Sequence, residues 1–127
     1  MERSKVLAAL AALANDKRLE LVRLLMPRGE TGLSAGEIGQ HLGLASSRLS
    51  FHLAALEQAG LIRSRRASRN VFYTVDLGGL GQTIGYLMRD CCMDHPEIRA
   101  CCQTHAPGET AAMVTYGDGV RTGTLKT

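Results

Sequence analysis

Three features of the sequence predict a mainly α-helical fold with one β-hairpin. Apolar residues recur with helical spacing along most of the chain, glycines punctuate its middle, and one stretch after Gly60 alternates with a two-residue period. The 127 residues are 45% hydrophobic but only 4% aromatic, so the core must be built from Leu, Ala, Val and Ile on helices. This length suits one domain, assigned to residues 1–102, while the Gly- and Thr-rich residues 103–127 are predicted to form a flexible tail.

Two helices are predicted before Pro27. Spacing of i, i+4 and i+7 predicts that the first buries a face carrying Val6, Leu10 and Leu13. Its small alanines would let another helix approach closely, so it is a candidate dimerisation helix. Asn15 or Asp16 can cap the second helix, because a short side-chain oxygen accepts hydrogen bonds from free backbone N–H groups. The second buried stripe is predicted to be Leu21, Leu24 and Leu25.

The next two helices are short and separated by a tight glycine turn. Ser34 lies three residues before Glu37, the spacing of a capping box, and Gly43 ends the helix that they open. Ser46 or Ser47 is predicted to cap the following helix, which ends at the next glycine. The apolar stripe of that helix is Leu49, Leu53 and Leu56. Helix, glycine turn and capped helix together predict a helix-turn-helix.

A hairpin follows this pair of helices. Residues 61–66 form its predicted first strand, residues 67–70 a polar turn and residues 71–75 the second strand. In the second strand, Val71, Tyr73 and Val75 are predicted to lie on one face, with Phe72 and Thr74 on the other. Because arginines lie on the first strand and in the turn, the hairpin has the character of a basic wing. The fold class predicted is therefore a winged helix-turn-helix that forms dimers.

The C-terminal part is predicted to contain one longer and one shorter helix. Helical apolar spacing returns over residues 77–92, although four glycines weaken it. Asp94 and Pro96 mark a break, and Asp94 or His95 can cap a short helix that runs through Cys101 and Cys102.

The distribution of charge predicts that the middle of the chain binds DNA. The whole chain carries only +3, but residues 46–75 hold five arginines and a single acid, which gives this stretch +4. A helix with short polar and basic residues in its first turns fits the major groove, and wing arginines suit phosphates or the minor groove. The predicted DNA-binding residues are Ser46, Ser47, Arg48, Ser50, His52, Arg63, Arg65, Arg66 and Arg69. Taken alone, a helix with a leucine stripe and serines is more often an ordinary packed helix, and an arginine-rich hairpin is more often only a solvated surface.

The sequence also predicts where the protein resides. No run reaches the roughly 20 apolar residues of a membrane helix, so the prediction is a soluble protein with no membrane partner. Arg3 and Lys5 followed by apolar residues resemble a secretory signal, but the helical pattern continues through residues 15–19, and we reject that interpretation. A cytoplasmic location is expected.

Four segments resemble the ArsR/SmtB family of metal-responsive repressors. They are residues 11–25 (AALANDKRLELVRLL), 37–43 (EIGQHLG), 46–62 (SSRLSFHLAALEQAGLI) and the hairpin up to Asp76. The resemblance implies a homodimer paired through its first and last helices, binding to double-stranded operator DNA, and repression of a resistance operon that an inducer relieves. Many arsenic sensors of this family carry a Cys-Val-Cys site before the recognition helix, but the matching residues 34–40 (SAGEIGQ) contain no cysteine.

All four cysteines instead form two adjacent pairs, Cys91 with Cys92 and Cys101 with Cys102. Neighbouring Cα atoms lie about 3.8 Å apart, shorter than the roughly 4.4 to 6.8 Å common for disulfides, so reduced thiols are expected. Thiolates select soft ions, and As(III) or Sb(III) takes three sulfurs in a trigonal pyramid. We therefore predict that Cys91 and Cys92, with Cys101 or Cys102, bind As(III) or Sb(III) as inducer, within one subunit or across the dimer. A methylated arsenical would need only two sulfurs.

Other interpretations of the cysteines stay open. They could form a zinc or cadmium site with four thiolates, or with His95 or His105; they could oxidise across the gap as a redox switch; or they could be inert. An enzyme is the opposing class of function, but the sequence supplies no anion-binding glycine loop, no Cys-His nucleophile motif and no pocket motif for an organic cofactor. The predicted mechanism is coupling: ligation of the last helix alters the dimer surface, changes the spacing of the two DNA-binding helices and lowers DNA affinity.

Overall fold

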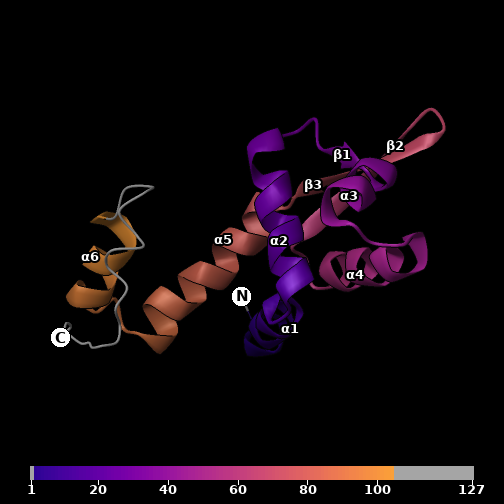
Figure 1. The fold of residues 1–127 in the computed structure, drawn as a ribbon. Coiled ribbons are helices and arrows are strands. Elements are labelled where there is room, and N and C mark those ends of the chain that lie inside the picture. Colours follow the sequence, from indigo (N-terminus) through magenta and orange to yellow (C-terminus); the bar gives the residue numbers. More distant parts are fainter. Residues whose placement is uncertain (1, 105–127) are drawn as a thin grey trace. The chain divides into compact units, whose positions relative to one another are not determined.

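The computed structural model describes residues 2–104 and contains a mainly helical fold with one small sheet (Figure 1). The elements follow the order α1 (Arg3–Leu13), α2 (Asp16–Leu25), the 3-10 turn η1 (Met26–Arg28), β1 (Leu33–Ser34), α3 (Ala35–Leu42), α4 (Ser46–Gln58), β2 (Ile62–Ala67), β3 (Asn70–Val75), α5 (Leu77–Tyr86), the π-helical turn η2 (Leu87–Cys91) and α6 (Pro96–Thr104). No helix among the described residues is long and apolar enough to cross a membrane.

The chain divides into two compact units, Met1–Leu87 and Met88–Thr127. In the second unit the structure describes residues 88–104. The boundary between the units thus lies before the cysteines, whereas the sequence prediction grouped residues 1–102. Of the predicted tail, residues 103 and 104 belong to α6, and residues 105–127 lie outside the described part of the chain.

The first unit has a core shared by its helices and its sheet. Its largest fully buried apolar side chains are Leu21, Leu25, Ile38, Leu56, Leu61 and Ile62. The predicted stripe of α4 is confirmed, since Leu49, Leu53 and Leu56 are all buried. In α2, Leu21 and Leu25 are buried with Val22, while Leu24 is only partly buried.

Helix α1 buries a different face from the predicted one. Val6 is buried as predicted, but its buried companions are Ala9 and Ala12 rather than Leu10 and Leu13. Leu7 is 58% exposed. Because every position of this helix from Val6 onward is Val, Leu or Ala, this part of its sequence lacks the apolar–polar contrast that marks an inward face.

The sheet has three antiparallel strands in the order β1-β3-β2. The hairpin β2–β3 confirms the predicted wing, with Ala67 paired to Asn70 and a two-residue turn between them. Figure 1 shows the hairpin tip projecting beyond the helices. Strand β1 was not predicted; Leu33 pairs with Tyr73 and Ser34 with Phe72, which ties the start of α3 to the wing.

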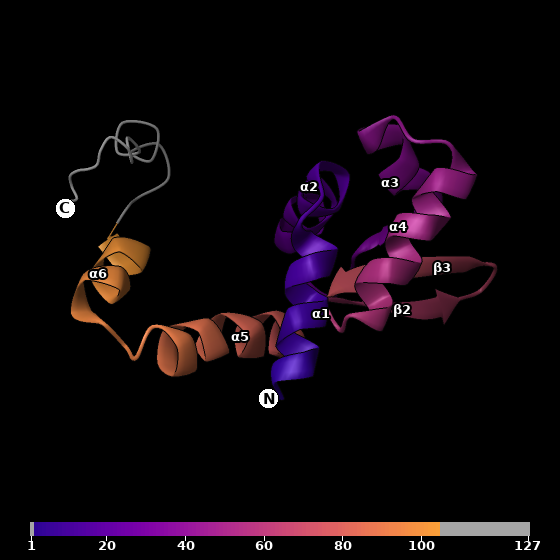
Figure 2. The same ribbon diagram turned by 90° about the horizontal axis from the view of Figure 1, so that it is seen from below.

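Helix α3 begins and ends at the predicted signals. Ser34 Oγ accepts a hydrogen bond from Glu37 N at 3.2 Å, and Ser34 N donates to Glu37 Oε1 at 2.9 Å, so the capping box is complete. Gly43 ends the helix with a left-handed backbone, φ +66°. Figure 2 shows α3 beside α4, and this pair is the helix-turn-helix. We call α3, α4 and the hairpin β2–β3 the reading head.

Helix α5 starts where the backbone comes closest to the reading head. Asp76 Oδ1 caps α5 by accepting a hydrogen bond from Gly79 N at 3.0 Å. A Cβ atom at Gly79 would overlap the carbonyl oxygen of Gly60, so only glycine fits there. The predicted helix over residues 77–92 is in fact α5 followed by the π-helical turn η2.

Candidate functional site

The start of α4 exposes polar groups with no partner inside the helix. Its N-cap is Ala45, which makes no side-chain cap, so the prediction that Ser46 or Ser47 caps this helix is wrong. Both serines instead lie in the first turn with exposed side chains, followed by exposed Arg48 and Ser50. Backbone N–H groups in a first turn have no intrahelical acceptor and attract anions. Ser46, Ser47, Arg48 and Ser50 are thus accessible for phosphate or base contacts.

His52 does not share this exposed surface. Its side chain is only 8% exposed, and its Nδ1 accepts a hydrogen bond from Arg18 Nε at 3.1 Å. Burial, followed by the charges of Arg18 and Arg48, lowers the pKa of His52 below its usual 6.5. The prediction that His52 contacts DNA is therefore corrected: this side chain is a neutral acceptor that joins α4 to α2.

Phe51 was missed among the candidates, although it is 65% exposed on α4. Its ring lies under the guanidinium of Arg18, whose Cζ is 5.3 Å from the ring centroid, and at an edge-to-face angle to His52. The sequence signal that could have revealed it is spacing, because Phe51 follows Ser47 by four residues and so lies on the same face of α4.

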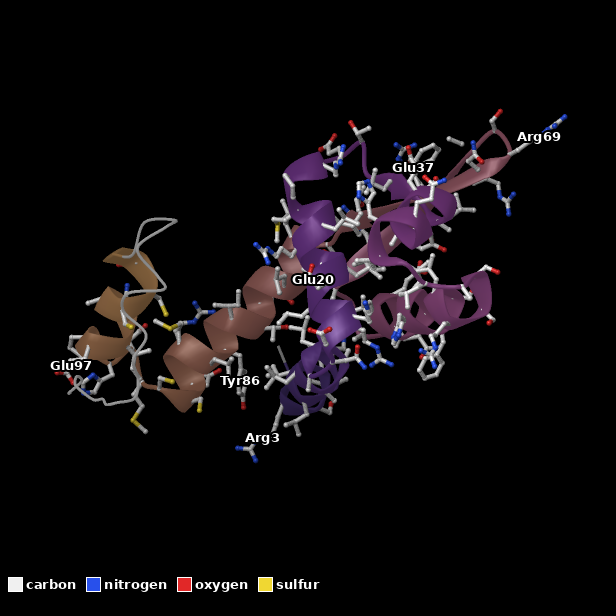
Figure 3. All side chains as sticks on the ribbon, in the orientation of Figure 1. Arg3, Glu20, Glu37, Arg69, Tyr86 and Glu97 are labelled. Atoms are coloured by element: carbon white, nitrogen blue, oxygen red, sulfur yellow. The ribbon has the colours of Figure 1, made fainter. Side chains whose placement is uncertain are left out.

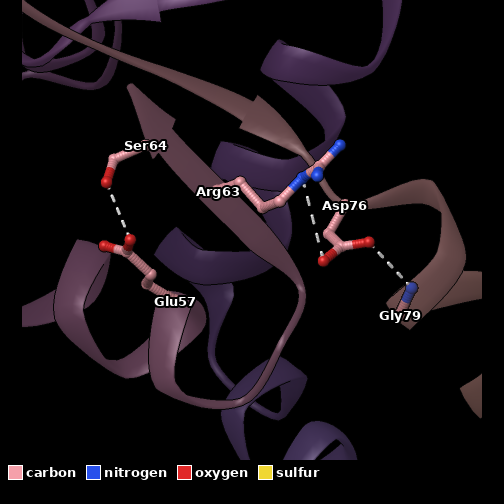
Figure 4. Close-up of polar contacts among 5 residues, drawn as sticks. All are labelled: Glu57, Arg63, Ser64, Asp76 and Gly79. Carbon is pink, nitrogen blue, oxygen red and sulfur yellow. Dashed lines mark hydrogen bonds and ion pairs between the residues drawn. The ribbon is translucent and has the colours of Figure 1, made fainter. Parts of the chain in front are cut away.

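The four wing arginines differ in their surroundings. Arg63 Nε lies 3.9 Å from Asp76 Oδ2, as Figure 4 shows. Arg65 donates a hydrogen bond to the carbonyl oxygen of Thr31 at 3.0 Å and stacks on Phe72 with its Cζ 5.2 Å from the ring centroid. Arg66 and Arg69 are exposed, and neither side chain forms a hydrogen bond or ion pair with any residue from 2 to 104.

Arg69 lies at the turn of the hairpin, and its side chain points away from the helices (Figure 3). Arg66 pairs through its backbone with Val71 in the β2–β3 ladder, one position before the turn-flanking pair. These two arginines are therefore the cations of the wing that remain available for a ligand.

A polar contact fixes the wing relative to α4. Ser64 Oγ on β2 donates a hydrogen bond of 2.7 Å to Glu57 Oε2 near the end of α4 (Figure 4). The same glutamate and burial raise the pKa of Tyr73 on β3. The helix and the hairpin are thus joined by side-chain contacts as well as by the core, which suits a rigid nucleic-acid-binding surface.

The four cysteines lie in the second unit, where we call residues 91–102 the cysteine segment. Cys91 ends the π-helical turn and Cys92 follows it, while Cys101 and Cys102 lie on α6. All four are free thiols; Cys92 is partly buried, and the others are exposed. Between the pairs, Met93 and Asp94 both have left-handed backbones, with φ of +52° and +53°, a conformation that costs non-glycine residues energy.

Two side chains brace the turn before α6. His95 Nδ1 accepts a hydrogen bond from Glu97 N at 3.1 Å, which confirms the prediction that His95 is a cap. Asp94 Oδ1 pairs with Arg99 at 2.6 Å. The Nδ1 atom of His95 is thus occupied by the cap.

The thiols interact but do not form a finished metal site. The pKa of Cys92 is raised, and burial is the largest cause. The charge and hydrogen bond of Cys91 come next, and the charge of Cys102 has the smallest effect. Within residues 2–104, no three His, Cys, Asp or Glu side chains converge closely enough to hold a metal ion. The donor set suits a soft ion, but binding through three sulfurs requires the two pairs to move together or a second chain to contribute.

Comparison with known proteins agrees with the architecture. A family model described as a helix-turn-helix domain matches residues 13–65. The transcriptional activator HlyU of Vibrio cholerae is 36% identical over 89 residues, covering 70% of this chain and 80% of HlyU. Its solved structure superposes with a TM-score of 0.56 over 72% of this chain and 99% of that one.

Two other proteins extend this comparison. A probable mercury resistance operon repressor of Streptomyces lividans is 32% identical over 98 residues, covering 77% of this chain and 74% of the repressor. A solution structure from Mycobacterium bovis, a homodimeric winged helix-turn-helix DNA-binding domain described as a possible ArsR-family regulator, is 25% identical with a TM-score of 0.57, covering 72% of this chain and 82% of that one.

These relatives are described as transcriptional regulators, a non-enzymatic class, and the Mycobacterium bovis domain is described as DNA-binding and homodimeric. With the helix-turn-helix, the arginine wing and relatives above 30% identity over most of their length, the chain belongs to the ArsR/SmtB family of winged helix-turn-helix DNA-binding regulators.

Proposed function

We propose that this regulator represses a metalloid-resistance operon and leaves its operator when As(III) or Sb(III) binds the thiolates of the cysteine segment. The observation that carries the proposal is the presence of two free thiol pairs in one small unit, with Cys91 and Cys102 both contributing to the raised pKa of Cys92. Similarity to a probable mercury resistance repressor supports a soft, thiol-binding inducer.

The ligand set that we favour is Cys91, Cys92 and Cys102. The charge of Cys102 contributes to the raised pKa of Cys92, so this thiol lies within electrostatic reach of Cys92. The reaction is a ligand exchange without electron transfer: As(OH)3 and three thiols form three As–S bonds and release three water molecules. Because the three sulfurs do not yet converge, binding within one protomer must draw α6 toward the turn after η2.

Variants of single cysteines test this ligand set. Cys102→Ser should abolish tight arsenite binding, while Cys101→Ser, its matched neighbour on α6, should keep it. The measurement is arsenite binding by calorimetry, with arsenic X-ray absorption to count sulfur neighbours. Equal loss in both variants, or none in either, would contradict the assignment.

The pH dependence of binding separates arsenite from zinc or cadmium. Neutral As(OH)3 reacting with protonated thiols releases water, so its apparent affinity should change little between about pH 6 and pH 8. A divalent ion must displace protons, and the raised pKa of Cys92 makes that displacement harder, so its affinity should rise with pH. Flat cadmium binding together with rising arsenite binding would refute this account.

DNA release is the decisive test of the function. Arsenite and antimonite should lower the affinity for the promoter of the protein's own operon, and the variant Cys91→Ser, Cys92→Ser, Cys101→Ser, Cys102→Ser should stay bound. Release by Zn(II) or Cd(II) alone would favour the metal-sensing alternative. Release by a peroxide alone, with two thiols oxidised to a disulfide, would favour the redox alternative.

We infer further that the dimer pairs through α1 and α5. Both helices lie in the first unit, contact each other and carry exposed large apolar side chains: Leu7 is 58%, Leu77 68% and Ile84 51% exposed. Ile84→Arg should therefore yield monomers in sedimentation experiments, while Leu19→Arg, at a 58% exposed leucine of α2, should leave dimers. Monomers from both variants, or from neither, would contradict this interface.

A further inference from the structure

An exposed aromatic ring interrupts the polar surface of α4. Phe51 shares one face of the helix with Ser47, four residues earlier, and both side chains are exposed. The ring is 65% exposed, more than any other large apolar side chain of α4. It lies outside the hydrophobic core, so most of the ring is available for contact with a partner outside the protomer.

The ring is also held in place. Arg18 Cζ lies 5.3 Å from its centroid, and Arg18 is itself anchored by donating from Nε to His52 Nδ1 at 3.1 Å. The His52 ring packs at 60° to Phe51 with 5.8 Å between centroids. A side chain fixed on two sides loses little freedom when a ligand covers it, so Phe51 is prepared for contact.

We propose that Phe51 is a specificity-determining residue that packs against the C5-methyl group of a thymine in the operator. The thymine methyl is the apolar group on the major-groove edges of the base pairs, and apolar side chains recognise it there. The serine on the same face, Ser47, and the positive charges of Arg18 and Arg48 favour DNA as the occupant over an apolar protein surface. The inference rests on DNA binding by α4.

Removing the methyl group tests the contact directly. Thymines in the footprinted operator are replaced one at a time by deoxyuridine, which lacks only that methyl. Wild-type protein should lose about fourfold in affinity at the contacted position, the effect expected for one buried methyl group. Phe51→Ala should bind thymine and deoxyuridine operators equally, and Phe51→Leu should keep part of the preference.

Controls make the result specific. Ser47→Ala, on the same face, should weaken binding but leave the thymine-to-deoxyuridine ratio unchanged. Phe51→Ala should keep the wild-type salt dependence, because no charge is lost. If wild type ignores every substitution, or Phe51→Ala shows the wild-type ratio, the proposal is overturned. This outcome is separate from arsenite release, which the cysteine variants test independently of Phe51.

Discussion

The two unpartnered wing arginines give the most quantitative expectation. Arg66 and Arg69 are exposed and make no ion pair with the described residues, whereas Arg65 is held by Thr31 and Phe72. Each phosphate contact contributes about 0.9 to the slope of log K against log salt concentration. If both arginines of each protomer contact phosphates, the variant Arg66→Ala, Arg69→Ala should lower that slope by about 3 to 4 in the dimer.

This change is large enough to measure by fluorescence anisotropy. Between about 50 and 200 mM salt, wild-type protein should lose about a hundredfold more affinity than the double variant. Arg23→Ala is the matched control, since this exposed arginine of α2 pairs with Glu20 at 3.6 Å and should leave the slope unchanged. An unchanged slope in the double variant would refute the assignment of the wing to the DNA backbone.

Three further expectations concern the framework of the reading head. Because the pKa of His52 is lowered in the folded protein, the unfolded chain takes up a proton near pH 6.5 before the folded protein does. The contribution of His52 to stability is therefore full above pH 6.5 and declines as the pH falls toward the folded pKa. His52→Gln should flatten this decline in urea unfolding between about pH 7.5 and 5.5. Equal declines would contradict it. Gly79→Ala should lower the stability by at least about 2 kcal/mol, because the new Cβ meets the Gly60 carbonyl oxygen. Gly81→Ala, which has open space around the new Cβ, should raise the stability by up to about 1 kcal/mol. Thermal unfolding measures both variants, and equal effects would count against the close approach of Gly79 to Gly60. Ser34→Ala should cost about 1 kcal/mol through loss of the capping box, and denaturation with no change would show that the cap is not stabilising.

Local signals in the sequence predicted most of the reading head. A capping box depends on two residues three apart, and a left-handed helix end depends on one glycine, so Ser34, Glu37 and Gly43 could be interpreted without knowledge of the fold. The hairpin was predictable for the same reason, although β2 begins one residue later than expected, at Ile62.

Features set by tertiary contacts were not predictable. Strand β1 has only two residues, too few to show an alternating pattern, and it exists because Leu33 meets Tyr73 from a distant part of the chain. The inward face of α1 depends on its neighbours, because its sequence from Val6 onward is apolar all round. Ala45 rather than a serine precedes α4, which leaves the hydroxyl groups of Ser46 and Ser47 uncommitted.

The candidate site divides in the same way. Arginine and cysteine clusters were visible because the residues are close in sequence, but His52 was misassigned because its partner Arg18 lies 34 positions away. That contact turned an apparent surface histidine into a buried acceptor and placed Phe51 beneath a guanidinium. Likewise, the spacing of the cysteines predicted thiol chemistry, while the effect of the Cys102 charge on the pKa of Cys92 depends on the structure of the turn.

The central claim is that binding of a soft ion to the cysteine segment controls DNA affinity. Its most direct test is a titration of arsenite into the protein bound to fluorescently labelled promoter DNA, with DNA anisotropy and free thiols followed together. We predict that the DNA dissociates in step with the loss of three thiols per protomer. Complete thiol loss with the DNA still bound would contradict the claim.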